Sequence, residues 1–201
     1  MVAIDRILWT LLSDNVDPTP MFPMQFFLRA HSCFRTAAAS AMAGQIYEAT
    51  VLQRSTLESA AYGLHIGSNQ ERAIIWLSRH DSKSATEKVR KEFSYGEMRR
   101  HFDADHPSLA ASFVSLYELS VDFGAHPNEA GFSISTSIRK DGKQKIIDTV
   151  YLHADELPLT FGLKNVARVG LWILLSFREL YPSIYSSRNV DALVQELVSR
   201  H

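Results

Sequence analysis

Apolar residues recur at helical spacing over most of the chain, and glycine, proline and short polar runs divide that pattern into segments. Apolar positions three and four residues apart predict amphipathic α-helices, whereas serine, aspartate, glycine and proline mark the places where helices begin and end. The segments predicted to be helical are about residues 1–12, 20–43, 45–66, 70–79, 83–100, 107–123, 157–181 and 190–199. We therefore expect a bundle of six or more helices.

Three of these segments define how the bundle is expected to assemble. Pro20 suits the first position of helix 20–43, where its missing N–H costs nothing. Gly44 is the predicted break before helix 45–66, and the alanines that precede it allow a neighbouring helix to approach closely. Helix 157–181 is apolar nearly all round, which places it at the centre of the bundle.

Near residues 131–152 the pattern changes from helical spacing to strict alternation of apolar and polar side chains. This alternation predicts two strands, and Asp141-Gly142 between them predicts a tight turn with positive φ angles. A two-stranded ribbon is only marginally stable alone, so its apolar face is expected to lie on helix 157–181. That face comprises Phe132, Ile134, Ile138, Val150 and Leu152. The predicted fold is thus mostly all-α, a single domain over residues 1–201 with one inserted β-hairpin.

Composition and charge narrow the function classes. The 201 residues are 46% hydrophobic, and their formal net charge of -1 provides no global field that would attract nucleic acid or acidic lipid. Cys33 is the only cysteine, which excludes an internal disulfide and a cysteine-based zinc cluster and favours a reducing compartment. The first residues lack the pattern of a signal peptide, and the most apolar later run is too short for a bilayer span. These features predict a cytoplasmic protein without a membrane segment.

The first candidate site is a polar stripe on the predicted helix 45–66. Arg54, Glu58 and His65 fall on one face of a helix that is otherwise apolar or small. One interpretation is a cleft in which Arg54 binds an anion, Glu58 acts as a base or as its partner, and His65 lies at the rim. The other is a structural Arg54–Glu58 pair with a solvated or hydrogen-bonded histidine. In either case we expect Arg54 and Glu58 to be largely buried and paired.

The second candidate site lies around the end of the predicted helix 107–123. Glu118 and Asp122 are one helical turn apart, and His126 follows the glycine that ends the helix. Carboxylates and an imidazole in this arrangement could bind a metal. The alternative is that Glu118 and Asp122 line a solvated face while His126 packs against the turn, and we assign no metal to these residues.

Two further strings match known motifs in part. The run from His101 to His106 resembles the ligand motif of metallo-β-lactamase-like hydrolases, with Asp103 in place of the second histidine and a charged helix before it. Arg99 or Arg100 with His106 matches the Arg-x4-6-His spacing of HEPN-type helical ribonucleases. Phosphate-loop, Walker, G-x-S-x-G and H-E-x-x-H motifs do not occur in the sequence.

Two segments together resemble a family of uncharacterised bacterial all-helical proteins. Those proteins share a helix-Gly-helix segment ending in Arg-Ser-x-x-Glu and a later Tyr-x-x-Ser followed by His-Pro. The matching residues are Gly44, Glu48, Ala49, Leu52, Arg54, Ser55, Glu58, Tyr117, Ser120, His126 and Pro127. The resemblance implies an all-helical fold in which the two segments face one another, and it implies no known activity.

Two hypotheses about function follow. The first is a non-enzymatic, self-associating helical domain with a polar pocket for a small molecule or partner. We expect this domain to be a homodimer. The sequence does not identify a cofactor. The pocket would be formed by Arg54, Glu58, His65, Tyr117, Asp122 and His126. The second is a HEPN-like ribonuclease or metal-dependent hydrolase that uses His126 with Glu58, Asp122 or both.

Overall fold

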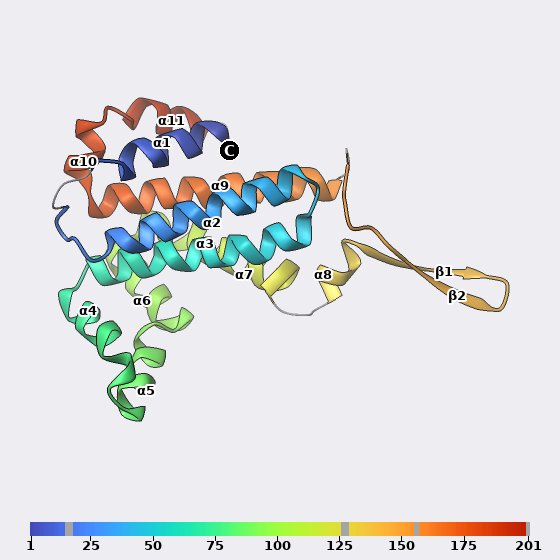
Figure 1. The fold of residues 1–201 in the computed structure, drawn as a ribbon, viewed down its shortest axis with the longest axis horizontal. Coiled ribbons are helices and arrows are strands. Elements are labelled where there is room, and N and C mark those ends of the chain that lie inside the picture. The colour runs from blue at the N-terminus through green and yellow to red at the C-terminus, as the bar shows by residue number, and fades with distance from the viewer. Residues whose placement is uncertain (15–17, 126–128, 155–156, 200–201) are drawn as a thin grey trace.

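The computed structural model describes residues 1–14, 18–125, 129–154 and 157–199, and within them the chain is mostly helical with a single two-stranded hairpin (Figure 1). The prediction of a mostly all-α fold with one inserted hairpin is confirmed. The elements are α1 (Val2–Leu12), α2 (Met24–Met42), α3 (Ile46–Gly67), α4 (Gln70–Leu77), the 3-10 helix η1 (Ser78–His80), α5 (Lys83–Glu92), α6 (Tyr95–Asp105), α7 (Pro107–Ser120), the π-helical η2 (Val121–Ala125), α8 (Glu129–Ser133), β1 (Thr136–Asp141), β2 (Gln144–Thr149), α9 (Leu157–Leu180), α10 (Pro182–Ser187) and α11 (Asp191–Ser199).

Helices α2, α3 and α9 form the centre of the bundle. In Figure 1 α1, α10 and α11 lie on one side of these three helices, and α4 to α7 lie on the other. Trp172 and Phe177 of α9 are fully buried, as expected for a helix that is apolar nearly all round. Gly44 separates α2 from α3 with a φ of +80°, and the buried alanines of α2 allow α3 to pack alongside it. The predicted break at Gly44 is therefore where the structure has it.

A smaller apolar cluster attaches α4 and α5 to the bundle. Val89 and Phe93 are buried against Ile66 of α3, and the rings of Tyr62 and Trp76 pack edge-on with a centroid separation of 5.3 Å. Edge-to-face aromatic contacts of this kind add to the free energy gained from burying the rings. The two short helices are therefore attached through this smaller cluster, which is separate from the main core.

Two predicted helices have different bounds. The segment 83–100 is two helices, because Ser94 accepts a hydrogen bond from the backbone N–H of Glu97 at 3.3 Å and caps a new helix there. Helix α2 begins at Met24 and not at Pro20. Pro23 is the N-cap of this helix and already has helical backbone angles, with φ of -61° and ψ of -24°.

The hairpin is shorter than predicted and starts later. Residues 129–133 form α8, so the first strand begins at Thr136. The two strands pair antiparallel, from Thr136 opposite Thr149 to Asp141 opposite Gln144. Gly142 and Lys143 form the turn, and among the described residues of the turn only Gly142 has a positive φ, of +60°. That arrangement, with glycine first, is a type II′ turn.

The hairpin stands away from the bundle, which contradicts the expectation that its apolar face packs on α9 (Figure 1). Ile138 and Ile147 lie opposite one another and remain 69% and 67% exposed. The ribbon follows α8, which packs on η2 and whose Gly131 lies close to Tyr47 of α3. This contact holds the chain at the end of the bundle, and the ribbon leaves from there.

Among the described residues, none of the helices combines the length and the apolar composition that a bilayer crossing requires.

Candidate functional site

Helices α3 and α7 bring three of the candidate residues together. Arg54 Nε donates a hydrogen bond to Glu58 Oε1 at 2.9 Å, one turn along α3. From α7, Tyr117 accepts a second hydrogen bond from Arg54 Nη2 at 2.7 Å. The guanidinium carbon also lies 4.7 Å from the centre of the Tyr117 ring, within the range of a cation–π interaction. The Arg54–Glu58 pair is thus part of a contact between two helices.

Arg54 and Glu58 are paired as expected, and most of each side chain is covered, although neither is fully buried. The side chains of Arg54 and Glu58 are 21% and 33% exposed, because Tyr117 covers only one side of the pair. Tyr117 is itself held by Tyr95, whose ring stacks on it at a centroid separation of 4.2 Å. Burial is the largest effect on the Tyr117 hydroxyl and raises its pKa, while the nearby guanidinium opposes that rise. The hydroxyl is therefore protonated at neutral pH and accepts from Arg54 as a neutral group.

We expect Tyr117→Phe to lower the free energy of unfolding by about 1 kcal/mol, because it removes the hydrogen bond to Arg54 and keeps the stacked ring. Tyr95→Phe is the matched control, since the Tyr95 hydroxyl makes a long, exposed contact of 3.4 Å with Glu118 and its other partner, Arg99, is also exposed. It should change stability by less than about 0.5 kcal/mol. Urea unfolding measures both, and equal losses would show that the Arg54 contact does not stabilise the fold.

The remaining residues of the second candidate site are placed differently. Asp122 is exposed on η2. Gly124 lies against the α3 backbone at Thr50 and Val51, where an added Cβ would come within 2.9 Å of both residues. The chain therefore approaches α3 one helical turn before Arg54. His126, the histidine assigned to both hypotheses, lies outside the described residues.

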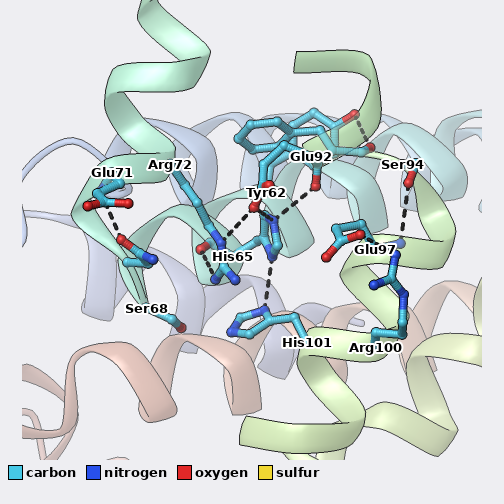
Figure 2. Close-up of polar contacts among 12 residues, drawn as sticks. Tyr62, His65, Ser68, Glu71, Arg72, Glu92, Ser94, Glu97, Arg100 and His101 are labelled. Atoms are coloured by element: carbon cyan, nitrogen blue, oxygen red, sulfur yellow. Dashed lines mark hydrogen bonds and ion pairs between the residues drawn. The ribbon is translucent and has the colours of Figure 1, made fainter. Parts of the chain in front are cut away.

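His65 does not join Arg54 and Glu58 but belongs to a second polar cluster, shown in Figure 2. Its side chain is fully buried, and its Nδ1 lies 2.9 Å from Nδ1 of His101 on α6. On the other side of the ring, Nε2 lies 3.1 Å from the backbone carbonyl of Glu92. Arg72 of α4 completes the cluster by donating to Glu92 Oε1 at 2.9 Å and to the carbonyl of His65 at 3.0 Å. Four helices therefore meet at this cluster.

The hydrogen-bond geometry assigns the tautomers of the two rings. The carbonyl of Glu92 is an acceptor, so Nε2 of His65 must carry the proton and its Nδ1 must accept. His101 then donates from Nδ1, and its Nε2 presents a lone pair. That Nε2 is buried without a hydrogen-bond partner among the described residues, 3.2 Å from the carboxylate of Asp105.

Both imidazoles are held in the neutral form. Burial, followed by the positive charge of Arg72, lowers the pKa of His65 from 6.5 to about 4. The same two causes, in the same order, lower the pKa of His101 to about 3, and Asp105 only partly opposes them. A neutral, buried pair of this kind holds helices together and acts poorly as a base that exchanges protons with solvent.

His106 extends the cluster towards α9, but the arginines of the Arg-x4-6-His match do not join it. Its Nε2 lies 3.1 Å from Ser68 Oγ, and its ring centre lies 5.4 Å from that of His101. Arg99 and Arg100 are exposed and pair with carboxylates of their own helix. The Arg-x4-6-His spacing in the sequence therefore does not bring Arg99 or Arg100 together with His106 on one face.

The sequence contained a signal for part of this cluster. Met98, His101 and Phe102 are three and four residues apart, and all three are buried on one face of α6. That spacing places His101 inside the bundle. Sequence reasoning missed Arg72 and Glu92, because no local pattern indicates which helix a partner comes from.

A cleft of about 170 Å³ lies elsewhere, between the start of α3 and the base of the hairpin. Tyr47 and Glu48 line one side, and Thr149, Val150 and Tyr151 line the other. Within the described parts of the chain, no three histidine, cysteine, aspartate or glutamate side chains are placed to hold a metal ion. In comparisons with known proteins, no family model, curated protein or solved structure matches this chain.

Proposed function

We propose that this chain is a non-enzymatic, self-associating interaction domain whose contact surface is the hairpin and its base. The observation that carries the proposal is the exposure of apolar side chains on a ribbon that no helix of the bundle covers. Single exposed apolar residues are common on protein surfaces, whereas a group of them on one projecting element marks an interaction site. The group comprises Ile138 and Ile147 on the two strands and, at the base of the hairpin, Phe132 of α8 with Val150, Tyr151 and Leu152 after β2.

The hydrogen bonds made by the candidate site residues support the proposal that the domain is not an enzyme. Arg54 is engaged by Glu58 and Tyr117, and both ring nitrogens of His65 have partners. Side chains engaged in this way hold helices together, as the contact of Arg54 with Tyr117 does between α3 and α7. The hairpin, in contrast, is unsupported, and a two-stranded ribbon is marginally stable without a partner.

Light scattering tests self-association directly. We expect the wild type to have the mass of a dimer, and a variant in which residues 136–149 are replaced by a short Gly-Ser linker to have the mass of a monomer. Circular dichroism should show that the variant keeps its helical signal, because the core lies in the bundle. Leu193→Ser is the matched control, since Leu193 is also an exposed apolar residue but lies on α11, and it should leave the dimer intact.

A wild type that stays monomeric at high micromolar concentration would contradict self-association. RNA cleavage by the purified protein that is lost in Glu58→Gln would contradict the non-enzymatic part and favour the ribonuclease hypothesis.

A further inference from the structure

We infer that a second copy of this chain pairs with the outer edge of β2, antiparallel and with Ile147 on the two-fold axis, so that the two ribbons form one four-stranded sheet. The inference rests on the proposed self-association and specifies the edge and the register.

The register of the hairpin determines which backbone groups of β2 are free. In a two-residue turn the flanking residues, here Asp141 and Gln144, form a hydrogen-bonded pair, and bonded and non-bonded pairs then alternate along the ribbon. The 2.8 Å hydrogen bond from Val150 N to Ser135 O fits this alternation. Ile147, opposite Ile138, is therefore in a non-bonded pair. Its N–H and C=O, like those of Lys145 and Thr149, point to the outer edge.

A partner strand centred on Ile147 uses all of these groups. Ile147 lies opposite the partner's Ile147, and Lys145 lies opposite the partner's Thr149, which gives a ladder of about six backbone hydrogen bonds. Ile138 and Ile147 share one face of the ribbon. The pairing therefore places the isoleucines of both copies in one continuous row across the sheet. Lysines do not face lysines between β2 and the partner's β2, and cross-strand pairs of β-branched residues stabilise a sheet.

The outer edge of β1 does not accept the same arrangement. A two-fold axis at Ile138 would place the partner's turn opposite Ser133 and Ile134, where α8 ends. At β2 the partner's turn instead reaches residues 150–152, which have no regular secondary structure and whose side chains are exposed. Tyr151, 79% exposed, lies opposite the partner's Lys143 in this register.

Charge at the base of the hairpin favours the same arrangement. Glu48 lines the cleft beside Tyr151 and is exposed. The partner's Lys143 would enter at this point, so an ammonium group would approach a carboxylate at each end of the sheet. Such complementarity selects a partner orientation more than it adds affinity.

Thiol cross-linking in a Cys33→Ala background tests the register, because Cys33 is the only cysteine in the chain and it is buried. A short bifunctional maleimide should link most of an Ile147→Cys protein into covalent dimers. Ile138→Cys is the matched control on the outer strand, where the two thiols would be about 14 Å apart across three strand spacings. It should give less than a tenth of that yield.

A second measurement leaves Ile147 unchanged. Lys145→Cys mixed with Thr149→Cys should form covalent heterodimers, and each variant alone should not. Efficient linking through Ile138→Cys, or equal linking at all four positions, would overturn the register. A dimer by light scattering without any of these links would overturn this inference alone, whereas a monomeric wild type would overturn the proposed function as well.

Discussion

Lowering the pH from 7 to 5 is expected to reduce the free energy of unfolding by about 4 kcal/mol through His65 and His101. The pKa of each imidazole is lowered from 6.5, to about 4 for His65 and about 3 for His101. Below pH 6.5 the unfolded chain takes up protons at both rings, and the folded chain does not until the pH approaches these lower values. The stabilisation is therefore fully present above pH 6.5 and is lost as the pH falls towards 4 and 3.

The charges around the two rings explain why the folded state resists protonation. Arg72 lies on one side of His65 and repels a second positive charge. Protonating both rings would also place two positive charges at nitrogens 2.9 Å apart. Glu92 and Asp105 carry the carboxylates nearest the pair, but Glu92 is already paired with the arginine. Burial then dominates, because the charged imidazole loses its hydration.

Urea unfolding at pH 7, 6 and 5 measures this effect. His80→Asn is the matched control, since His80 is exposed at the end of η1 and its removal should leave the pH dependence unchanged. Histidine ring signals in NMR provide an independent readout, because those of His65 and His101 should show no titration above pH 5. A wild type whose stability is the same at pH 5 and pH 7 would show that the rings ionise freely in the folded protein.

Gly44→Ala is expected to lower the free energy of unfolding by about 3 kcal/mol. Gly44 has a φ of +80°, which residues with a Cβ rarely adopt. An added Cβ would also lie against the carbonyl oxygen of His153 and 2.9 Å from its nitrogen. His153 N donates to Gly44 O at 3.0 Å, so this contact ties the α2–α3 turn to the segment that follows β2. The position of the added Cβ is fixed by the backbone of residue 44, and the atoms that it meets are backbone atoms of His153, so the clash cannot be relieved without disturbing that hydrogen bond.

Substitutions at two other glycines distinguish the cost of the positive φ at Gly44 from the cost of the clash with His153. Gly142 also has a positive φ but has open space around its Cβ position, so Gly142→Ala should cost only the backbone strain, about 1 kcal/mol. Gly96 lies in α6 with no contact and no positive φ, and its replacement by alanine should stabilise the fold by up to about 1 kcal/mol. If Gly44→Ala cost no more than Gly142→Ala, the contact with His153 would not constrain the turn.

The sequence by itself determined the features that depend on neighbours along the chain. The apolar spacing of α9 predicted its central position, and the glycine at 44 predicted the break between α2 and α3. The Arg54–Glu58 pair followed from a separation of four residues on one helix. Alternating residues predicted the hairpin, although not the helix α8 before it. Each of these is a local pattern, and helical or strand periodicity is enough to reveal it.

Only the tertiary structure decided which elements meet. The position of α7 supplied Tyr117 to Arg54, and the folding of α4 to α6 against α3 joined His65 to His101 and Arg72. The direction of the hairpin, away from α9, depended on the packing of α8 at the end of the bundle. The spacing of apolar residues along a helix indicates which side chains face inward. Which side chain on another helix each of them contacts depends on the relative placement of whole helices. That placement results from the summed packing of the core, so no single segment encodes it.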